Sequence, residues 1–458
     1  MSMLFNGLSG VVASQIALDA VSQNLANTLT PNYTRQGVSL VAKAATSGSL
    51  AAGHGVEVAS LVRYADSYKT QQMWRSNSTL GQYEAGQTYL QQLEQVMGDT
   101  TSGLSASLDN FFAALSAASV EPASGPLRQQ IIEQASALGQ SVGNLSQIIS
   151  NQRVAVAQQR EVVVEELNSY VKEIAALNAQ IIQSQGAGLN TSALQDQRDA
   201  RVDDLSKLVG IQALTQPDGS LSLSLRGGQP LVVGERSATM SVGTTSTGDV
   251  LEVQFGVEQF TLEASNWQGT LGGLTALETD ILQPLATSVQ EMAAAITSQF
   301  NSVLTQGYGV TGSTLSPPLF VLDLSSSTGL LTVNPAVTAD NLGLSSVIDE
   351  AGNSDNLQQL IALQHQPVTV SLLGSSVMLA DVYTQLVGKL GTYSQQNTAS
   401  YETAETVRNQ SQSNWNATSA VNTDEEAVNL MQYQQMYQAN MKVISTANEL
   451  FDSLLQLR

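Results

Sequence analysis

Two short glycine-containing segments have the residue types and spacing of known catalytic or cofactor-binding motifs. The first, residues 139–143, reads Gly-Gln-Ser-Val-Gly and fits the nucleophile-elbow pattern of serine hydrolases. That pattern requires a strand before the serine and a helix after it, so that a strained turn presents the hydroxyl group. Here the segment lies inside a helical apolar repeat. We therefore interpret it as a serine and two glycines on the exposed face of a helix.

The second segment, residues 307–312, reads Gly-Tyr-Gly-Val-Thr-Gly and fits the dinucleotide-binding fingerprint. That fingerprint must follow a strand and open a helix, so that the pyrophosphate meets the helix N-terminus. This segment instead follows a predicted helix and leads into Pro317-Pro318. We therefore interpret it as a flexible loop.

Charged side chains gather between residues 196 and 204. The cluster consists of Asp196, Arg198, Asp199, Arg201, Asp203 and Asp204. On a predicted helix, these spacings favour exposed ion pairs. No acid, base and nucleophile converge in the sequence, so we expect no enzyme activity and no cofactor.

Cysteine is absent from the chain, and there are two histidines, His54 and His365, far apart in the sequence. The absence of cysteine excludes disulfides, cysteine-ligated zinc, iron–sulfur clusters and thiol nucleophiles. A multi-histidine metal site would have to unite these two distant residues. We therefore expect no catalytic, cofactor-binding or metal-binding residues.

Charge and length narrow the class of protein. The chain has 458 residues, beyond the about 250–300 that a single core supports, so two or more structural units are expected. Charged residues make up 12% and the net charge is −21, which argues against nucleic acid and against an anionic membrane surface. No run approaches the about 18 consecutive apolar residues of a membrane span. Residues 1–34 also lack a basic n-region, so we expect a cytoplasmic protein or one exported without an apolar signal peptide.

Both ends of the chain carry apolar residues at heptad spacing, which predicts a long helix at each end. A single helix of this kind is better explained as an amphipathic core helix, but two at opposite termini favour a coiled-coil pair. We expect the pair to supply the assembly interface. Its residues are Leu4, Leu8, Val11, Leu18 and Leu25 at the N-terminus, and Met436, Val443, Ala447, Leu450, Leu454 and Leu457 at the C-terminus.

Local signals indicate where these helices begin and end. The first should stop near Asn27, because asparagine tolerates the left-handed cap and Pro31 follows. Residues 29–41 then read as extended. Residues 423–426, Thr-Asp-Glu-Glu, form a capping box that opens the last helix, and their acids suit the positive end of its dipole.

The interior is mainly helical, with strictly alternating, turn-bounded segments between residues 211 and 267. The fold class is therefore mainly α with an inserted β domain: paired terminal coiled-coil helices, a long-helix bundle domain and a small antiparallel β outer domain. We expect residues 1–45 with 415–458 to form the terminal helices and residues 211–267 the β domain. The bundle takes residues 46–210, 268–310 and 375–414, while residues 311–374 are mixed and assigned to no domain.

The two ends also resemble those of a known class, the bacterial flagellar axial proteins. The motif residues are Asn24, Leu25, Ala26, Asn27, Thr28, Pro31, Tyr33 and Arg35, with Tyr433, Gln434, Tyr437, Ala439 and Asn440 near the C-terminus. Interior segments, among them Asp-Gln-Arg-Asp at residues 196–199, are similar to those of the family of flagellar hook-associated protein 1, the first hook–filament junction protein. Many members of that family carry an additional outer domain, for which this chain has little room.

The resemblance implies a structural adaptor that joins the flagellar hook to the filament. It implies a homo-oligomeric ring, contacts with the hook protein and with a second junction protein, and a location outside the cell. In such a ring the terminal helices line the export channel, the helical domain surrounds them and the β domain faces solvent. Export would use the flagellar type III apparatus, with a dedicated chaperone holding the C-terminal region.

Two other functions are compatible with parts of the sequence. A hook or rod axial protein would share both ends, but it is expected to be richer in β-structure than the long helical stretch of residues 127–181 allows. A secreted coiled-coil adhesin would have a similar composition, but the paired terminal motifs would then be coincidental. Loss of filaments on deletion of the gene separates the junction role from the adhesin.

Overall fold

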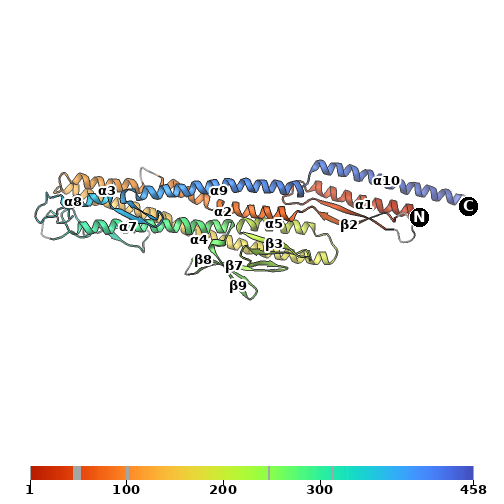
Figure 1. The fold of residues 1–458 in the computed structure, drawn as a ribbon, viewed down its shortest axis with the longest axis horizontal. Coiled ribbons are helices and arrows are strands. Elements are labelled where there is room, and N and C mark those ends of the chain that lie inside the picture. Colours follow the sequence, from red (N-terminus) through yellow and green to blue (C-terminus); the bar gives the residue numbers. More distant parts are fainter. Residues whose placement is uncertain are drawn as a thin grey trace. The chain divides into compact units, whose positions relative to one another are not determined.

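The computed structural model describes residues 2–44, 53–98, 103–245, 248–310, 314–326 and 328–456. It confirms a mainly α fold with small antiparallel sheets (Figure 1). The helices are α1 (Ser2–Ala26), α2 (Ser67–Met97), α3 (Leu104–Ala118), α4 (Gly125–Gly186), α5 (Ser192–Leu208), α6 (Gly269–Leu277), α7 (Gln283–Leu304), α8 (Asp355–Ala362), α9 (Val382–Ser419) and α10 (Thr423–Gln456). A π-helical turn, Glu278–Leu282, joins α6 to α7.

The strands form five small sheets in the described part of the chain. Their bounds are β1 (Gln36–Ala42), β2 (Val56–Arg63), β3 (Ile211–Thr215), β4 (Leu221–Leu225), β5 (Pro230–Val233), β6 (Arg236–Ser237), β7 (Thr239–Thr245), β8 (Gly248–Phe255), β9 (Glu258–Glu263), β10 (Phe320–Leu322), β11 (Leu331–Val333), β12 (Pro367–Val370) and β13 (Ser375–Met378). The sheets have the orders β1-β2, β3-β4-β5-β6, β7-β8-β9, β10-β11 and β12-β13, and every pairing is antiparallel. The alternating segment Leu221–Leu225 is a strand with its leucines buried, as predicted.

The chain divides into two compact units. The first contains residues 1–80, 165–269 and 404–458, and the second contains residues 81–164 and 270–403. The first therefore holds both terminal helices, α5 and the sheets of residues 211–263. The division passes through α2, α4 and α9, so helices that are continuous in the chain contribute to both cores.

Asparagine side chains attach backbone segments to helices in the first unit. On α4, Asn178 donates to the carbonyls of Leu221 and Gly234, and its Oδ1 accepts the Leu221 N–H. Asn168, on the same helix, donates to the Met240 carbonyl and accepts the Met240 N–H. An amide group offers both a donor and an acceptor, and so can pair with a backbone segment as a strand would. These contacts fix the sheets against α4 without any charge.

The second unit has a conventional apolar core. Four aromatic rings, Phe111, Phe112, Phe300 and Phe320, pack with centroid separations of 5.1–6.0 Å. Such tilted and edge-on pairs are the favoured arrangements for aromatic rings. The rings come from α3, α7 and β10, so this cluster joins the mixed segment of residues 311–374 to the helices.

Arg128 is a fully buried cation in the same unit, with 1% of its surface exposed. Its guanidinium donates to the carbonyls of Pro122, Ala339 and Leu342. Burial lowers the pKa of Arg128 to about 10. The side chain thus links the start of α4 to the segment that follows β11.

The 139–143 segment lies inside α4, as expected, but the prediction that its glycines are exposed is wrong. Gly139 and Gly143 are both buried. A Cβ on Gly139 would lie 2.6 Å from the Leu331 carbonyl oxygen, and one on Gly143 would meet the Thr328 carbonyl. The two glycines therefore let the segment around β11 approach the helix axis closely. Ser141 exchanges a 2.7 Å hydrogen bond with Ser107.

The 307–312 segment follows α7 and opens no helix, so it lacks the context of a dinucleotide site. Its described residues are bonded rather than free, contrary to the flexible loop that we predicted. The Tyr308 N–H donates to Ser345, the Val310 N–H donates to Asp340, and the Gly307 carbonyl accepts the Ser316 N–H. Residues 311–313 lie outside the described residues.

Candidate assembly surface

The two terminal helices lie side by side in the first unit, in contact along most of α1 (Figure 1). The face of α1 turned towards α10 consists of small residues. The buried residues of α1 are Gly7, Gly10, Ala13, Ser14, Ala17, Ala20, Val21 and Asn24. A Cβ at Gly7 would lie 2.9 Å from the Ile444 side chain, and one at Gly10 would overlap the Asn440 amide. Glycine at these two positions lets the helix backbones approach closely.

This small-residue seam adjoins the leucine-rich seam that the sequence analysis proposed. Residues 7, 10, 14, 17, 21 and 24 repeat the same 3-4 spacing one position earlier in the heptad. The spacing of these small residues is therefore visible in the sequence. A search for large apolar residues passes over it, because glycine and alanine are only weakly apolar. The contact within the chain uses the small residues, and the large ones are left partly outside it.

The proposed interface residues are accordingly half-buried or exposed. Leu4, Val11, Leu18, Leu25, Val443 and Ala447 are half-buried, and Leu8, Met436 and Leu450 are exposed. Leu457 and the side chain of Leu454 lie outside the described residues. The pairing of α1 with α10 covers this seam only in part.

Further large apolar side chains are exposed on the same two helices. They are Met3, Phe5, Leu8 and Val12 on α1, and Val428, Met431, Met436, Met441, Leu450, Phe451 and Leu455 on α10. We call this set the apolar terminal face. The only charged residue of α1 is Asp19. Exposed apolar surface of this extent, on two long helices, is typical of a protein interaction site.

A polar cluster holds α1 to the segment that follows it, and Asn24 is its centre. Asn24 is fully buried; its amide donates to the Gln36 carbonyl, and its Oδ1 accepts the Gln36 N–H and the Tyr33 hydroxyl. It also bonds Glu426 of α10. Burial, followed by the charges of Asp196 and Glu426, raises the pKa of Tyr33 to about 12, so its hydroxyl stays protonated and donates.

Arg35 links the same segment to the turn between α9 and α10. Its backbone N–H donates to the Ser419 carbonyl and its Nε to the Thr418 carbonyl. Its guanidinium pairs with Glu425 at 2.6 Å and lies 4.9 Å from the centroid of the Tyr64 ring. Arg35 therefore fixes the start of α10 beside the start of β1.

The predicted capping box is wrong in register. Asn422, one residue earlier, caps α10, because its Oδ1 accepts the N–H groups of Asp424 and Glu425. Glu426 is buried and bonds Asn24 instead of capping its own helix. The two carboxylates that read as a cap are thus engaged by residues from the other end of the chain.

The prediction of exposed ion pairs at residues 196–204 holds for Arg201, which pairs with Asp204 at the surface, but it is wrong for the rest of the cluster. Asp196, Arg198 and Asp203 are each at most 9% exposed. The guanidinium of Arg63, at the end of β2, lies 2.6 Å from the Asp196 carboxylate and 2.9 Å from that of Asp199. Burial raises the pKa of Asp196, and the Arg63 charge opposes that shift. This buried network joins the β1-β2 hairpin to α5.

The other motif residues divide between turns and helix surface. Ala26 ends α1; Asn27, Thr28 and Pro31 lie in the turns that follow it, and the left-handed residue is Asn32 (φ 59°), not Asn27. On α10, Tyr433, Tyr437 and Asn440 are half-buried, while Gln434 and Ala439 are exposed. Motif residues that recur in axial proteins thus serve mainly contacts within one chain.

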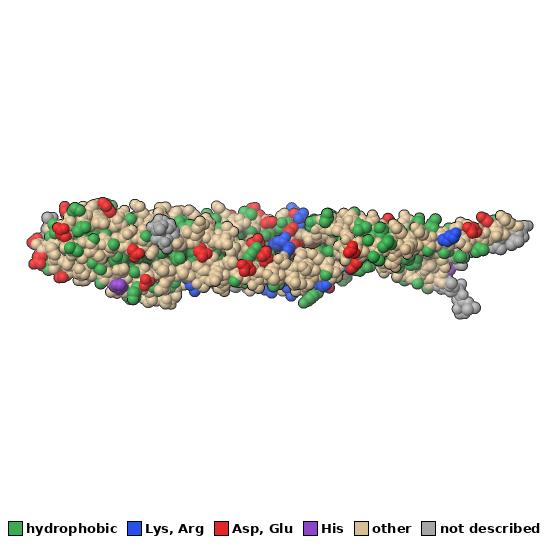
Figure 2. All heavy atoms as spheres, turned by 90° about the horizontal axis from the view of Figure 1, so that it is seen from above, with side chains coloured by type: hydrophobic (Ala, Val, Ile, Leu, Met, Phe, Trp, Pro, Cys, Tyr) green, Lys and Arg blue, Asp and Glu red, His purple; other side chains and the backbone are tan. Residues whose placement is uncertain are grey.

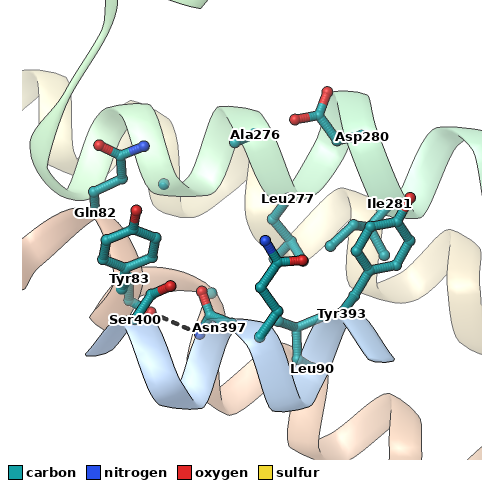
Figure 3. A pocket seen from close by; sticks show the side chains of 13 residues that line it. Gln82, Tyr83, Leu90, Ala276, Leu277, Asp280, Ile281, Tyr393, Asn397 and Ser400 are labelled. Carbon is teal, nitrogen blue, oxygen red and sulfur yellow. Dashed lines mark hydrogen bonds between the residues drawn. The ribbon is translucent and has the colours of Figure 1, made fainter. Parts of the chain in front are cut away.

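A pocket of about 260 Å³ lies among α2, α6, the π-helical turn and α9 in the second unit (Figure 3). The rings of Tyr83 and Tyr393 and the Asp280 carboxylate line it, and the Asn397 amide donates to the Tyr83 carbonyl at 3.0 Å. These groups comprise no nucleophile–base pair. Among the described residues, no group of three or more His, Asp or Glu side chains could hold a metal ion.

One helix, residues 3–26 of α1, is long and apolar enough to cross a membrane, with a mean hydropathy of 1.3. A count of consecutive apolar residues had not indicated this. The same helix is packed against α10, and 44% of its most apolar window is buried. Core helices of soluble proteins meet the same criterion.

Comparison with known proteins identifies the class and then the family. The flagellar basal body rod FlgEFG C-terminal family matches residues 412–457, which places α10 among the flagellar axial proteins. The flagellar hook-associated protein FlgK helical domain matches residues 90–320, half of the chain. The chain belongs to the FlgK family of flagellar hook-associated proteins.

Individual relatives agree over the whole length. Flagellar hook-associated protein 1 of Salmonella typhimurium is 26% identical over 558 aligned positions, covering all of both chains. That of Bacillus subtilis is 26% identical, covering 99% of this chain and 98% of its own. The flagellar hook junction protein FlgK of Burkholderia pseudomallei is 28% identical, with a TM-score of 0.51 over 55% of this chain and 47% of that one. An alignment of 558 positions places at least 100 of them opposite gaps in this 458-residue chain.

Proposed function

We propose that this chain is the structural adaptor that joins the flagellar hook to the filament, as a ring of identical subunits. The observation that carries the proposal is the apolar terminal face, which stays exposed after α1 and α10 have paired. In a lone chain this apolar surface remains in contact with water, which is unfavourable, but neighbouring copies can bury it. Membership of the FlgK family supports the location in the flagellum.

The terminal helices are proposed as the inner layer of the ring, with the helical domain outside them and residues 211–267 facing solvent. The polar cluster around Asn24 and the Arg63 network support this arrangement. The Asn24 cluster ties α1 to its own chain, and the Arg63 network ties the adjoining β1-β2 hairpin to α5, so that the contact with other copies is left to the apolar residues. The partners are further copies, the hook protein and a second junction protein.

Export through the flagellar type III apparatus is part of the same proposal, with a chaperone holding the C-terminal region. Isolated helices are marginal in water, so α1 and α10 can stay unfolded until they pair. Among the remaining alternatives, a hook or rod protein accords poorly with α4, a single helix of 62 residues. The role proposed is structural, not catalytic.

Electron microscopy of cells lacking this gene tests the proposal. We expect hooks without filaments and flagellin in the medium, because filament subunits would leave the hook with nothing to polymerise on. Restoring the gene should restore filaments. Cells that keep filaments without it would contradict the junction role, and cells that keep swimming normally would favour the adhesin.

A further inference from the structure

The last turns of α10 extend beyond the end of α1. Gly10 lies against Asn440, and Gly7 lies against Val443 and Ile444, so the helices run antiparallel. Continuing that register places Ser2 opposite residue 448 or 449. The described residues that follow, 449–456, therefore have no partner on α1. We call them the overhang.

The overhang is apolar although it is uncovered. Leu450 is 54% exposed, and Phe451 and Leu455 are each 60% exposed. Its charged residues, Glu449 and Asp452, are both acidic. Two helical turns of this composition are not stable by themselves in water, because nothing buries their apolar side chains.

An apolar groove lies elsewhere in the same unit, between α1 and the β1-β2 hairpin. It has a volume of about 690 Å³, and its walls include Phe5, Leu8, Val12 and Ile16 of α1 and Val56 of β2. The hairpin is held there by a hydrogen bond from the Val56 N–H to Ser9 Oγ. A two-stranded hairpin is marginal without further packing, so its position depends on what it meets.

The rim of the groove carries one cation with which an acidic helix can pair. Lys43 is exposed on the rim and pairs with Glu57 at a distance of 3.7 Å, too long for a strong bond. The adjoining part of α1 has no charge before Asp19. The rim thus holds one accessible cation, Lys43, and one exposed carboxylate, Glu57, and Glu449 or Asp452 of an overhang can compete with Glu57 for the Lys43 ammonium.

On these grounds, and resting on the proposed function, we propose that the overhang of one copy docks in the α1–hairpin groove of the next. The contact joins two different surfaces, so it is head-to-tail and propagates into a ring or a helical array. The overhang cannot reach the groove of its own chain. Leu8 lies near the position of Val443, and Phe451 is eight residues further along α10, about 12 Å away.

The absence of cysteine from the chain makes the contact testable by cross-linking. The variant Leu8→Cys/Phe451→Cys would be expressed in cells lacking the gene, and the assembled flagella would be oxidised and run without reductant. A disulfide requires Cα atoms within about 7 Å, so bonds can form only between copies. We expect a ladder of multimers from the double variant, dimers at most from a mixture of the two single variants, and monomers from each alone.

The matched control is Leu8→Cys/Met431→Cys, since Met431 is equally exposed on α10 but lies outside the overhang. Cross-linking as strong as that of the Phe451 pair would overturn the proposal, as would dimers from Leu8→Cys alone, which indicate a symmetric contact. Filaments without any ladder would also overturn it while leaving the junction role intact. If the first pair prevents assembly even when reduced, Val12→Cys/Leu455→Cys gives the same test.

Discussion

The terminal helix pair and the second unit bury opposite kinds of side chain. In the second unit, large side chains such as Phe111 and Phe300 are at most 1% exposed and pack against one another. In the terminal pair, glycine and alanine face inwards, while Phe5 and Phe451 face outwards with more than half of their surface exposed. The second unit buries its large apolar side chains within one chain, whereas the terminal pair leaves its own exposed, and we propose that other copies cover them.

The two regions also differ in how they use polar groups. Terminal motif residues such as Asn24 and Arg35 bond other parts of the same chain, so the apolar surface stays free for other copies. Across the molecule, few charged side chains are available, and much of the face seen in Figure 2 is uncharged. Amide groups therefore provide many of the polar contacts, as Asn168 and Asn178 show.

Removing both terminal regions should have the largest effect on assembly and a small one on folding. A fragment of residues 67–414 keeps the second unit, α5 and the sheets of residues 211–263, and it loses the β1-β2 hairpin. We expect it to be monomeric by gel filtration, helical by circular dichroism and cooperative in urea unfolding. In cells it should restore no filaments at all.

An aggregated or non-cooperative fragment would mean that the terminal helices belong to the core of the monomer. The matched control is the fragment 42–414, which retains the hairpin strand β2 and Arg63. If only the longer fragment folded, the Arg63 network rather than the terminal helices would be the required element.

Truncating a core side chain of the second unit should have a large effect on folding, whereas truncating a side chain of the apolar terminal face should have a small one. Phe300→Ala removes a buried ring from the aromatic cluster, and such changes cost about 3–5 kcal/mol of unfolding free energy. Leu8→Ala, on the apolar terminal face, should change the unfolding free energy of the isolated monomer by less than about 0.5 kcal/mol. Urea unfolding of both variants measures the two values. Equal losses would mean that Leu8 is already part of a core.

Arg128 tests whether the second unit depends on one buried cation. Arg128→Leu leaves the carbonyls of Pro122, Ala339 and Leu342 without their donor, and each unsatisfied group costs about 1–3 kcal/mol. Removing a buried charge offsets part of this, so we expect a net loss of about 1–3 kcal/mol in urea unfolding. The matched control is Arg75→Leu, since Arg75 is exposed on α2. If Arg128→Leu left the free energy of unfolding unchanged, the loop around residue 340 would be held by its apolar contacts.

Periodicity predicted most of the fold, because buried positions recur at fixed spacing in helices and strands. The long helix α4 and the strand Leu221–Leu225 both lie where the sequence placed them. Local rules failed where a distant residue competes for the same group. Glu426 reads as a cap but bonds Asn24, and Asp196 reads as a surface charge but meets Arg63 from more than a hundred residues away.

The interface residues proposed from the sequence stay a prediction for the same reason. A single chain shows which side chains it leaves uncovered, such as Leu8 and Leu450, but it does not show what covers them. The small-residue seam of Gly7 and Gly10 could have been read from its spacing. Its role depends on a close helix approach, which apolarity alone does not indicate.

The smallest expected effect is a change of melting temperature with pH. It should arise from the polar cluster around Asn24 and not from the apolar terminal face, which has no titratable group of its own in the set defined above. Burial raises the pKa of Glu426 above its ordinary value of 4.5, and the nearby Glu425 charge adds to this, while Asn24 and Arg35 oppose it. The folded state therefore binds that proton more tightly than the unfolded state, so this group favours folding more as the pH falls through its folded pKa and less at neutral pH.

Glu426→Gln keeps a bond to Asn24 without the charge, so we expect a slightly higher melting temperature at pH 7. The advantage over the parent should shrink as the pH approaches 4.5. Glu405→Gln, an exposed site on α9, should leave the melting profile unchanged. A melting temperature lowered at pH 7 by Glu426→Gln would show that the ionised carboxylate stabilises the cluster, with the Arg35 charge outweighing burial.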